Sequence, residues 1–174
     1  MTLLLQTERL RLRRFTSDDV DSFLRLISDA EVMRYIGDGK TDNREGAKTR
    51  LARIVRYYEN YPGLGVWATE QKSSGQVIGW FVLKYIPNTV EVEIGYLLQK
   101  AAWGQGFATE GARALLAYGF DKVGMNRIVA VANVANQASQ NVMKKIGLRN
   151  CGISRYYDRD VAYFVGERPG INAC

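Results

Sequence analysis

The chain begins with segments whose hydrophobic spacing is easy to interpret. Leu10 and Leu12 stand between arginines over residues 7–14, and this period of two predicts a half-buried strand. Hydroxyl and acidic residues at 16–19 can cap a helix, because their side chains accept bonds from free backbone N–H groups. Helices are expected over residues 16–27, 31–36 and 44–58, the last with apolar residues Ala47, Leu51, Ile54, Val55 and Tyr58 at helical spacing.

The middle of the chain changes to strand periodicity. Strands are expected over residues 65–70, 77–85 and 89–98, separated by short turns. In the third strand Val90, Val92, Ile94 and Tyr96 share one face, and Glu91, Glu93 and Gly95 share the other. The turns are too short for parallel crossovers, so these strands should form an antiparallel meander.

The second half alternates helix and strand. Helices are expected over residues 108–122 and 136–146, and strands over 127–134, 149–157 and 160–166. The strand at 127–134 is apolar on both faces, as a buried parallel strand is. The pattern predicts a mixed α/β (α+β) fold in one domain, residues 1–174. Its sheet should be mostly antiparallel, with about seven strands, a parallel pair at its centre and helices on both faces.

Composition excludes several classes of chemistry. The chain has no histidine and two cysteines, Cys151 and Cys174, which excludes a Ser-His-Asp hydrolase and histidine-based zinc chemistry; we expect no metal. No signal peptide or membrane-spanning run of ~20 apolar residues is present, so a cytoplasmic protein without a membrane partner is expected.

The net charge of +6 suits an acidic partner, such as a polyphosphorylated cofactor or RNA, and equally a mildly basic solvated surface. Basic residues over 44–56 scatter around the helix with no aromatic stacking platform between them. They predict a solvated face or a docking surface for an acidic acceptor, without direct nucleic-acid binding.

The segment 91–110 runs from a strand through a glycine-containing loop into a helix. Gly104 and Gly106 leave backbone N–H groups uncovered where the helix begins, which makes an anion site with the helix dipole. Thr109 can add a hydroxyl group. The motif lacks the third glycine of a Rossmann fingerprint and the Gly-Lys-Ser/Thr of a Walker loop. A tight turn with close strand–helix packing is the structural alternative.

A second group of polar residues opens the next helix. Asn136 and Ser139 are three residues apart and share one face of it, expected to lie opposite a core stripe of Ala138, Val142 and Ile146. Asn136 can also serve simply as the N-cap of this helix.

These segments together resemble the GNAT N-acetyltransferase superfamily, and within it the Rim-like branch of ribosomal-protein N-terminal acetyltransferases. The resemblance covers nearly the whole chain. It rests on Thr-Glu-Arg-Leu-Arg-Leu-Arg at the start, Glu-Ile-Gly-Tyr, Trp-Gly-Gln-Gly-Phe-Ala-Thr-Glu, and Asn-x-x-Ser-x-x-Val-x-x-Lys-Ile-Gly-Leu. The last two motifs in this order are more specific than either alone.

The resemblance implies acetyl-CoA as co-substrate and a splayed parallel strand pair that admits it. It places the pyrophosphate on Gly104, Gln105, Gly106, Phe107, Ala108 and Thr109, the pantetheine arm along Tyr96, Leu97 and Leu98, and Asn136 and Ser139 facing the cofactor. Many members carry Arg or Gln where this chain has Ala101, so backbone donors should dominate, with Gln99 or Lys100 assisting.

Acetyl transfer to an amine needs a base for the amine and an acid for the leaving thiolate. Glu93 is the favoured base, acting through a water; Glu91 and Asp158 are alternatives, and so is an ordinary structural carboxylate at Glu93. The resemblance favours Ser139 as the acid. Tyr156 and Tyr157 are rivals, because a phenol is more acidic than a serine hydroxyl.

The acceptor is a primary amine, and the Rim-like resemblance favours a protein or peptide N-terminal α-amine. A polyamine, an aminoglycoside and a non-catalytic acyl-CoA sensor are the alternatives. A homodimer is expected from the habit of the family alone.

Overall fold

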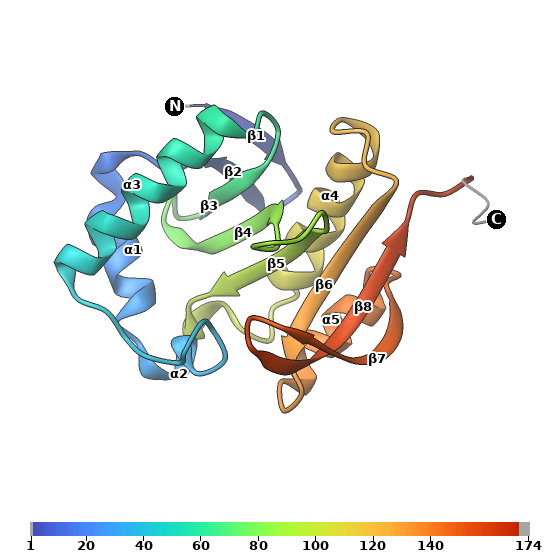
Figure 1. Ribbon diagram of the computed structural model, residues 1–174. Helices are drawn as coiled ribbons and strands as arrows, with labels where there is room; N and C mark the ends of the chain where they lie inside the picture. The colour runs from blue at the N-terminus through green and yellow to red at the C-terminus, as the bar shows by residue number, and fades with distance from the viewer. Residues whose placement is uncertain (1, 171–174) are drawn as a thin grey trace.

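The computed structural model describes residues 2–170, which form one eight-stranded sheet with the strand order β1-β2-β3-β4-β5-β6-β8-β7 (Figure 1). Neighbouring strands are antiparallel except β5 and β6, which are parallel. The strands are β1 Leu3–Gln6, β2 Leu10–Arg14, β3 Gly65–Gln71, β4 Val77–Tyr85, β5 Val92–Leu98, β6 Arg127–Asn133, β7 Arg149–Tyr156 and β8 Arg159–Glu167. The predicted fold class is confirmed.

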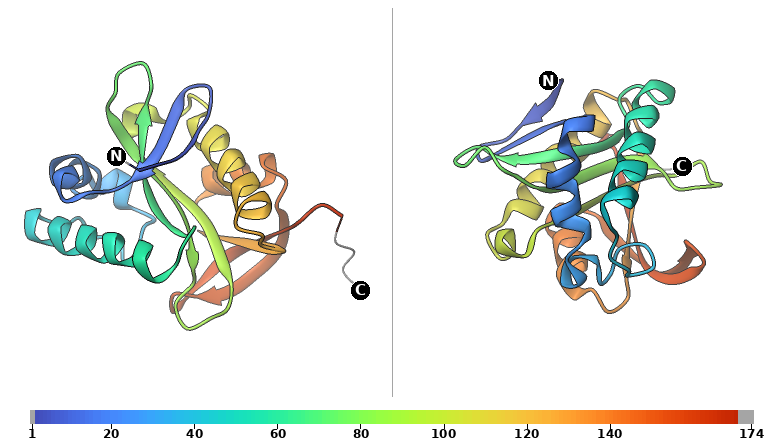
Figure 2. Two further views of the ribbon diagram at one scale, coloured as in Figure 1. Left: turned by 90° about the horizontal axis from the view of Figure 1, so that it is seen from above. Right: turned by 90° about the vertical axis from the view of Figure 1, so that its left-hand side faces the viewer.

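Helices cover both faces of the sheet, with α1 and α3 on one side and α4 and α5 on the other (Figure 2). Their bounds are α1 Val20–Ile27, α2 Ala30–Met33, α3 Arg44–Asn60, α4 Phe107–Asp121 and α5 Gln137–Lys145. None of these helices is long and apolar enough to span a membrane.

Helix α4 packs very closely on the sheet. A Cβ atom on Gly111 would lie 2.3 Å from Cζ of Phe81 on β4, so a side chain at this position would push the helix away. Leu115, one turn further on, is fully buried in the same core. This close packing sets the distance between the first turns of α4 and the sheet at β4 and β5.

The structure departs from the sequence expectations at three places. Strand β1 was not predicted: Leu3–Gln6 lacks apolar–polar alternation, and the pairing with β2 supplies its structure. Strand β5 begins at Val92, and Val90, expected on the inner face, is 91% exposed, because a turn with Asn88 at φ 62° precedes the strand. Val55 of α3 is also exposed.

The outermost strand, β7, pairs irregularly with β8. The register shifts between Asn150 and Ile153, and Gly152 has φ 86° at that point. Most of β7 is exposed, including Ile153. The bulge bends this strand before it reaches the hairpin that connects it to β8.

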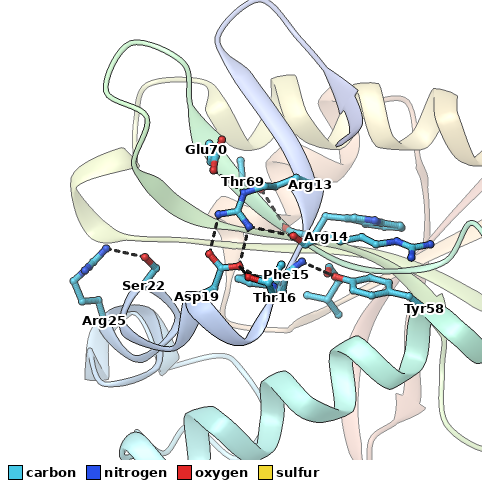
Figure 3. A network of polar contacts seen from close by, with 12 residues as sticks. Arg13, Arg14, Phe15, Thr16, Asp19, Ser22, Arg25, Tyr58, Thr69 and Glu70 are labelled. Carbon is cyan, nitrogen blue, oxygen red and sulfur yellow. Dashed lines mark hydrogen bonds and ion pairs between the residues drawn. The ribbon is translucent and has the colours of Figure 1, made fainter. Parts of the chain in front are cut away.

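A buried ion-pair network joins β2, β3 and the turn before α1 (Figure 3). The guanidinium of Arg13 donates to both carboxylate oxygens of Asp19 at 2.8 Å and to Glu70 at 2.6 Å. Asp19 also accepts from the backbone N–H of Thr16 at 2.8 Å. Burial raises the pKa of Asp19, but the bonds from Arg13 and Thr16 outweigh it and hold that pKa below its ordinary value.

We expect Asp19→Asn to destabilise the protein by about 3 kcal/mol at neutral pH, because it leaves a buried guanidinium without one of its carboxylates. Since the pKa of Asp19 is lowered on folding, its stabilisation is present above the unfolded pKa of about 3.9 and is lost as the pH falls through the folded value. The variant should therefore lose less stability than the wild type on acidification below pH ~4. Urea unfolding across this pH range measures both effects.

Asp21→Asn is the matched control, because Asp21 pairs with Arg44 where both side chains are more than half exposed. Equal unfolding free energies for the two variants would contradict the role given to the buried network.

Candidate functional site

The central parallel pair of strands separates after a single contact. Strands β5 and β6 share one register pair, Glu93 with Val129, although each is seven residues long. Strand β6 instead pairs along its whole length with β8. From Glu93 onward, the sheet therefore opens between β5 and β6.

The backbone of β5 supplies unpaired groups to this opening. The carbonyl of Glu91 and the N–H of Gln99 both bond to β4 or its ends. Bonded positions alternate along an antiparallel pair, so the odd residues, including Leu97, bond to β4. Tyr96 and Leu98 consequently direct their N–H and C=O groups toward β6, beyond the last β5–β6 pair. The carbonyl of Leu98 accepts a hydrogen bond from the indole N–H of Trp103 at 2.8 Å, so both groups of Tyr96 and the N–H of Leu98 remain for a ligand.

A glycine loop lies at the end of β5. Gly104 and Gly106 have φ 74° and 83°, a left-handed conformation that glycine adopts without strain. Gly106 is the N-cap of α4, and within the described residues no side chain caps this helix. The N–H groups of its first turn therefore stay available to an anion, while Phe107 is buried in the core.

Arg9, which the sequence analysis did not single out, holds the glycine loop from the turn between β1 and β2. Its guanidinium donates to the carbonyl of Gln105 at 3.0 Å, pairs with Glu110 at 2.6 Å and lies 4.4 Å from the centre of the Phe107 ring. Thr7 donates to the same carboxylate at 2.5 Å. The start of α4 is thus tied to the N-terminal hairpin, about 100 residues away in the chain.

A shallow hollow of about 680 Å³ lies beside this clamp. Its charged lining residues are Arg9, Arg113, Lys145 and Glu110, the last paired with Arg9, around Gly106 and Thr109. Lys100, expected as an assisting cation, pairs instead with Glu31 of α2. Arg9 therefore supplies the positive charge near the loop that Ala101 cannot.

The start of α5 faces the opening from the α4 side of the sheet. Asn136 is the N-cap of α5, and its side chain accepts from the backbone N–H of Ser139 at 3.1 Å. Burial raises the pKa of Tyr96, and the nearby hydroxyl of Ser139 offsets part of that rise. Ser139 thus lies beside a β5 residue. The core-stripe prediction is wrong at Ala138, which is exposed.

Glu93 is buried at the point where the strands separate. Its Oε1 atom accepts a hydrogen bond from the Tyr157 hydroxyl and lies 3.0 Å from Nζ of Lys84. Burial and the charge of Glu93 raise the pKa of Tyr157 well above its ordinary range, so the phenol remains a donor to the carboxylate.

Glu91 has a separate set of partners. It accepts from Tyr156, and from Tyr163 at 2.6 Å, while Arg127 lies 3.3 Å away. Burial raises the pKa of Glu91, but these partners reverse the effect and lower it below its ordinary value. Burial and the bond to Glu91 raise the pKa of Tyr156, which weakens it as an acid.

Asp158 lies in the hairpin loop after Tyr157, with φ 59° and an exposed side chain. The candidate carboxylates therefore differ in setting: Glu93 and Glu91 are each held by a tyrosine, while Asp158 faces solvent. No group of three or more metal-ligating side chains occurs in residues 2–170.

The two sides of the opening carry different chemistry. Leu97 belongs to the core under α1 and α3, and Ile94 and Leu98 to the core under α4. Since side chains alternate along a strand, Glu93 faces the α1–α3 side, and Tyr96 with Ser139 faces the α4–α5 side. A carboxylate and a hydroxyl thus approach one gap from opposite faces.

Comparison with known families decides the class to which this arrangement belongs. Residues 9–149 match the model of the acetyltransferase (GNAT) domain. The chain belongs to the GNAT acetyltransferase family. GNAT enzymes transfer the acetyl group of acetyl-CoA, and this chain is an acetyltransferase of that family.

Two relatives and one solved structure match most of this chain. The YkkB protein of Bacillus subtilis is 33% identical over 97% of this chain and 96% of its own length. The FsC-acetyl coenzyme A-N(2)-transacetylase of Aspergillus fumigatus is 29% identical over 83% of this chain, which spans 64% of that longer protein. RimL, a ribosomal L7/L12 alpha-N-protein acetyltransferase in complex with coenzyme A, has the same fold: TM-score 0.81 and 17% identity over 95% of this chain and 98% of its own.

We expect Arg9→Met to weaken acetyl-CoA binding about tenfold or more, which corresponds to ~1.4 kcal/mol. The variant loses a cation beside Gly106 and the bond that holds the Gln105 carbonyl. Arg9→Lys should give an intermediate loss, because it keeps the charge without the forked contacts. Calorimetric titration with acetyl-CoA measures the three affinities.

Arg44→Met removes an exposed arginine of α3 and should leave the affinity unchanged. If Arg9→Met bound acetyl-CoA as tightly as this control does, Arg9 would have no part in the cofactor site.

Proposed function

We propose that this GNAT enzyme transfers the acetyl group to a primary amine in a ternary complex, with the α-amine of a protein or peptide N-terminus as the favoured acceptor. The observation that carries the proposal is the opening between β5 and β6, which has the uncapped start of α4 at one end and a buried carboxylate at its apex.

The residues present fit acetyl-CoA. The free N–H groups of the glycine loop and Arg9 suit the pyrophosphate, with Gly104, Gln105, Gly106, Phe107, Ala108 and Thr109 around it. The unpaired N–H and C=O groups of Tyr96 and the N–H of Leu98 suit the amides of the pantetheine arm, whereas Leu97 contributes its backbone to β4. Asn136 and Ser139 would contact the arm from α5.

The chemistry divides between the two faces of the sheet. Bound acetyl-CoA supplies an activated thioester, whose C–S bond breaks as the new C–N bond forms. Glu93 accepts the proton of the amine, directly or through one water, from the α1–α3 face. Ser139, next to Tyr96, donates a proton to the thiolate from the α4–α5 face. The backbone N–H groups of β5 polarise the carbonyl.

A protein or peptide N-terminus is favoured as the acceptor for two reasons: the fold is similar to that of RimL, and the sequence motifs resemble the Rim-like branch. A small-molecule amine is the second candidate, because the Aspergillus fumigatus relative is by its name a transacetylase of FsC at N(2). A homodimer and a cytoplasmic location remain predictions.

The experiment is a thiol-release assay with acetyl-CoA against peptides with free and with blocked N-termini, polyamines and aminoglycosides. Release with free-N-terminus peptides only would support the favoured acceptor; release with small amines only would replace it by the second candidate. Binding of acetyl-CoA without release from any of these amines would reject both acceptor classes and leave an untested acceptor or an acyl-CoA sensor.

Glu93→Gln should lower kcat by roughly 10²-fold at neutral pH, because a neutral amide cannot accept the proton. Acetyl-CoA affinity should stay unchanged, since Glu93 lies on the face away from Ser139. Glu59→Gln, on the exposed side of α3, is the matched control. A Glu93→Gln enzyme with wild-type turnover would remove Glu93 as the base.

A further inference from the structure

The hairpin between β7 and β8 has an unusual residue at its tip. Tyr156 pairs with Arg159, so Tyr157 and Asp158 form a two-residue loop, and both have positive φ, 54° and 59°. Such loops favour Asn and Gly, because a side chain with a Cβ atom is strained in this conformation. A tyrosine at the first position therefore raises the local conformational free energy relative to Asn or Gly.

The side chain of Tyr157 makes contacts that account for its presence. Its hydroxyl donates to Oε1 of Glu93, 64 residues away, and lies 3.3 Å from Nζ of Lys84. The Lys84 ammonium also lies 5.6 Å from the centre of the tyrosine ring. Tyr157 itself is 41% exposed, so the contact with Glu93, rather than burial of the ring, is its main connection to the core.

Both contacts of Glu93 go to the same carboxylate oxygen. Tyr157 and Lys84 reach Oε1, and no side chain of residues 2–170 bonds to Oε2. Since no fully buried polar side-chain atom in this part of the chain lacks a partner, Oε2 keeps some exposure although Glu93 as a whole is buried. The carboxylate is thus held by one oxygen while the other is free for an incoming donor.

We infer that Tyr157 is a positioning residue for acetyl transfer: the strained hairpin tip holds Glu93 by Oε1 so that Oε2 faces the acceptor amine or its water. The inference rests on the proposed function, because it requires Glu93 to be the base. Tyr157 acts through Glu93 and needs no contact with either substrate.

The test compares Tyr157→Phe with Tyr157→Asn. Both variants lose the hydroxyl, but Asn adopts positive φ with less strain than Phe. We expect both to lower kcat about tenfold or more with an unchanged KM for acetyl-CoA, while the Asn variant melts roughly 2–4 °C above the Phe variant. Tyr118→Phe, which loses a phenol bonded to Gly63 far from Glu93, should keep wild-type kcat.

A double variant isolates the route of the effect. Adding Tyr157→Phe to Glu93→Gln should slow the enzyme no further, because the base that Tyr157 holds is already gone. Independent losses in the double variant, or a kcat that follows the melting temperature across the Phe and Asn variants, would overturn the inference.

The assay separates this inference from the proposed function. A slow Glu93→Gln enzyme with a fully active Tyr157→Phe enzyme would reject the positioning role alone. A fully active Glu93→Gln enzyme would reject both.

Discussion

The separation of β5 from β6 is the constraint on which the rest of the structure depends. A buried backbone N–H or C=O group without a partner costs free energy, so two strands that diverge in the middle of a sheet need something between them. Here the single pair Glu93–Val129 is followed by free backbone groups at Tyr96 and a free N–H at Leu98, whose carbonyl accepts from Trp103. A ligand with its own amides satisfies these groups, which makes the fold and its co-substrate complementary.

Three distant connections keep the opening in shape. The Arg9–Glu110 clamp fixes the start of α4, Ser139 brings the start of α5 close to Tyr96 of β5, and Tyr157 joins the last hairpin to Glu93. Each connection reaches the opening from a different element. The geometry of the site is therefore a property of the whole domain, and little of it is local to the glycine loop.

The sequence predicts well what local patterns determine. Alternation located the strands of the meander, and helical spacing located α3 and α4. The glycines at 104 and 106 lie in the loop before α4, as expected, and the anion site there stays a prediction. Strand β1 was not predicted, because its residues lack an alternating pattern and its structure depends on pairing with β2.

The missed residues have a common physical reason. Arg9 and Lys84 show no local signal for their roles, because their partners Glu110 and Glu93 come from other elements of the fold. Tyr157 was considered only as an acid, since no sequence pattern reveals that it has positive φ and donates to Glu93. Pairings across such separations depend on tertiary packing.

The bulge in β7 has a consequence for how copies of this protein meet. An outer strand with a straight, free backbone edge invites another chain to extend the sheet, which is a common route to aggregation. The register shift between Asn150 and Ile153 interrupts that edge, and the opposite outer strand, β1, is only four residues long. Neither end of the sheet is a good template, so self-association of this enzyme would have to use side-chain surfaces instead of continuous strand addition.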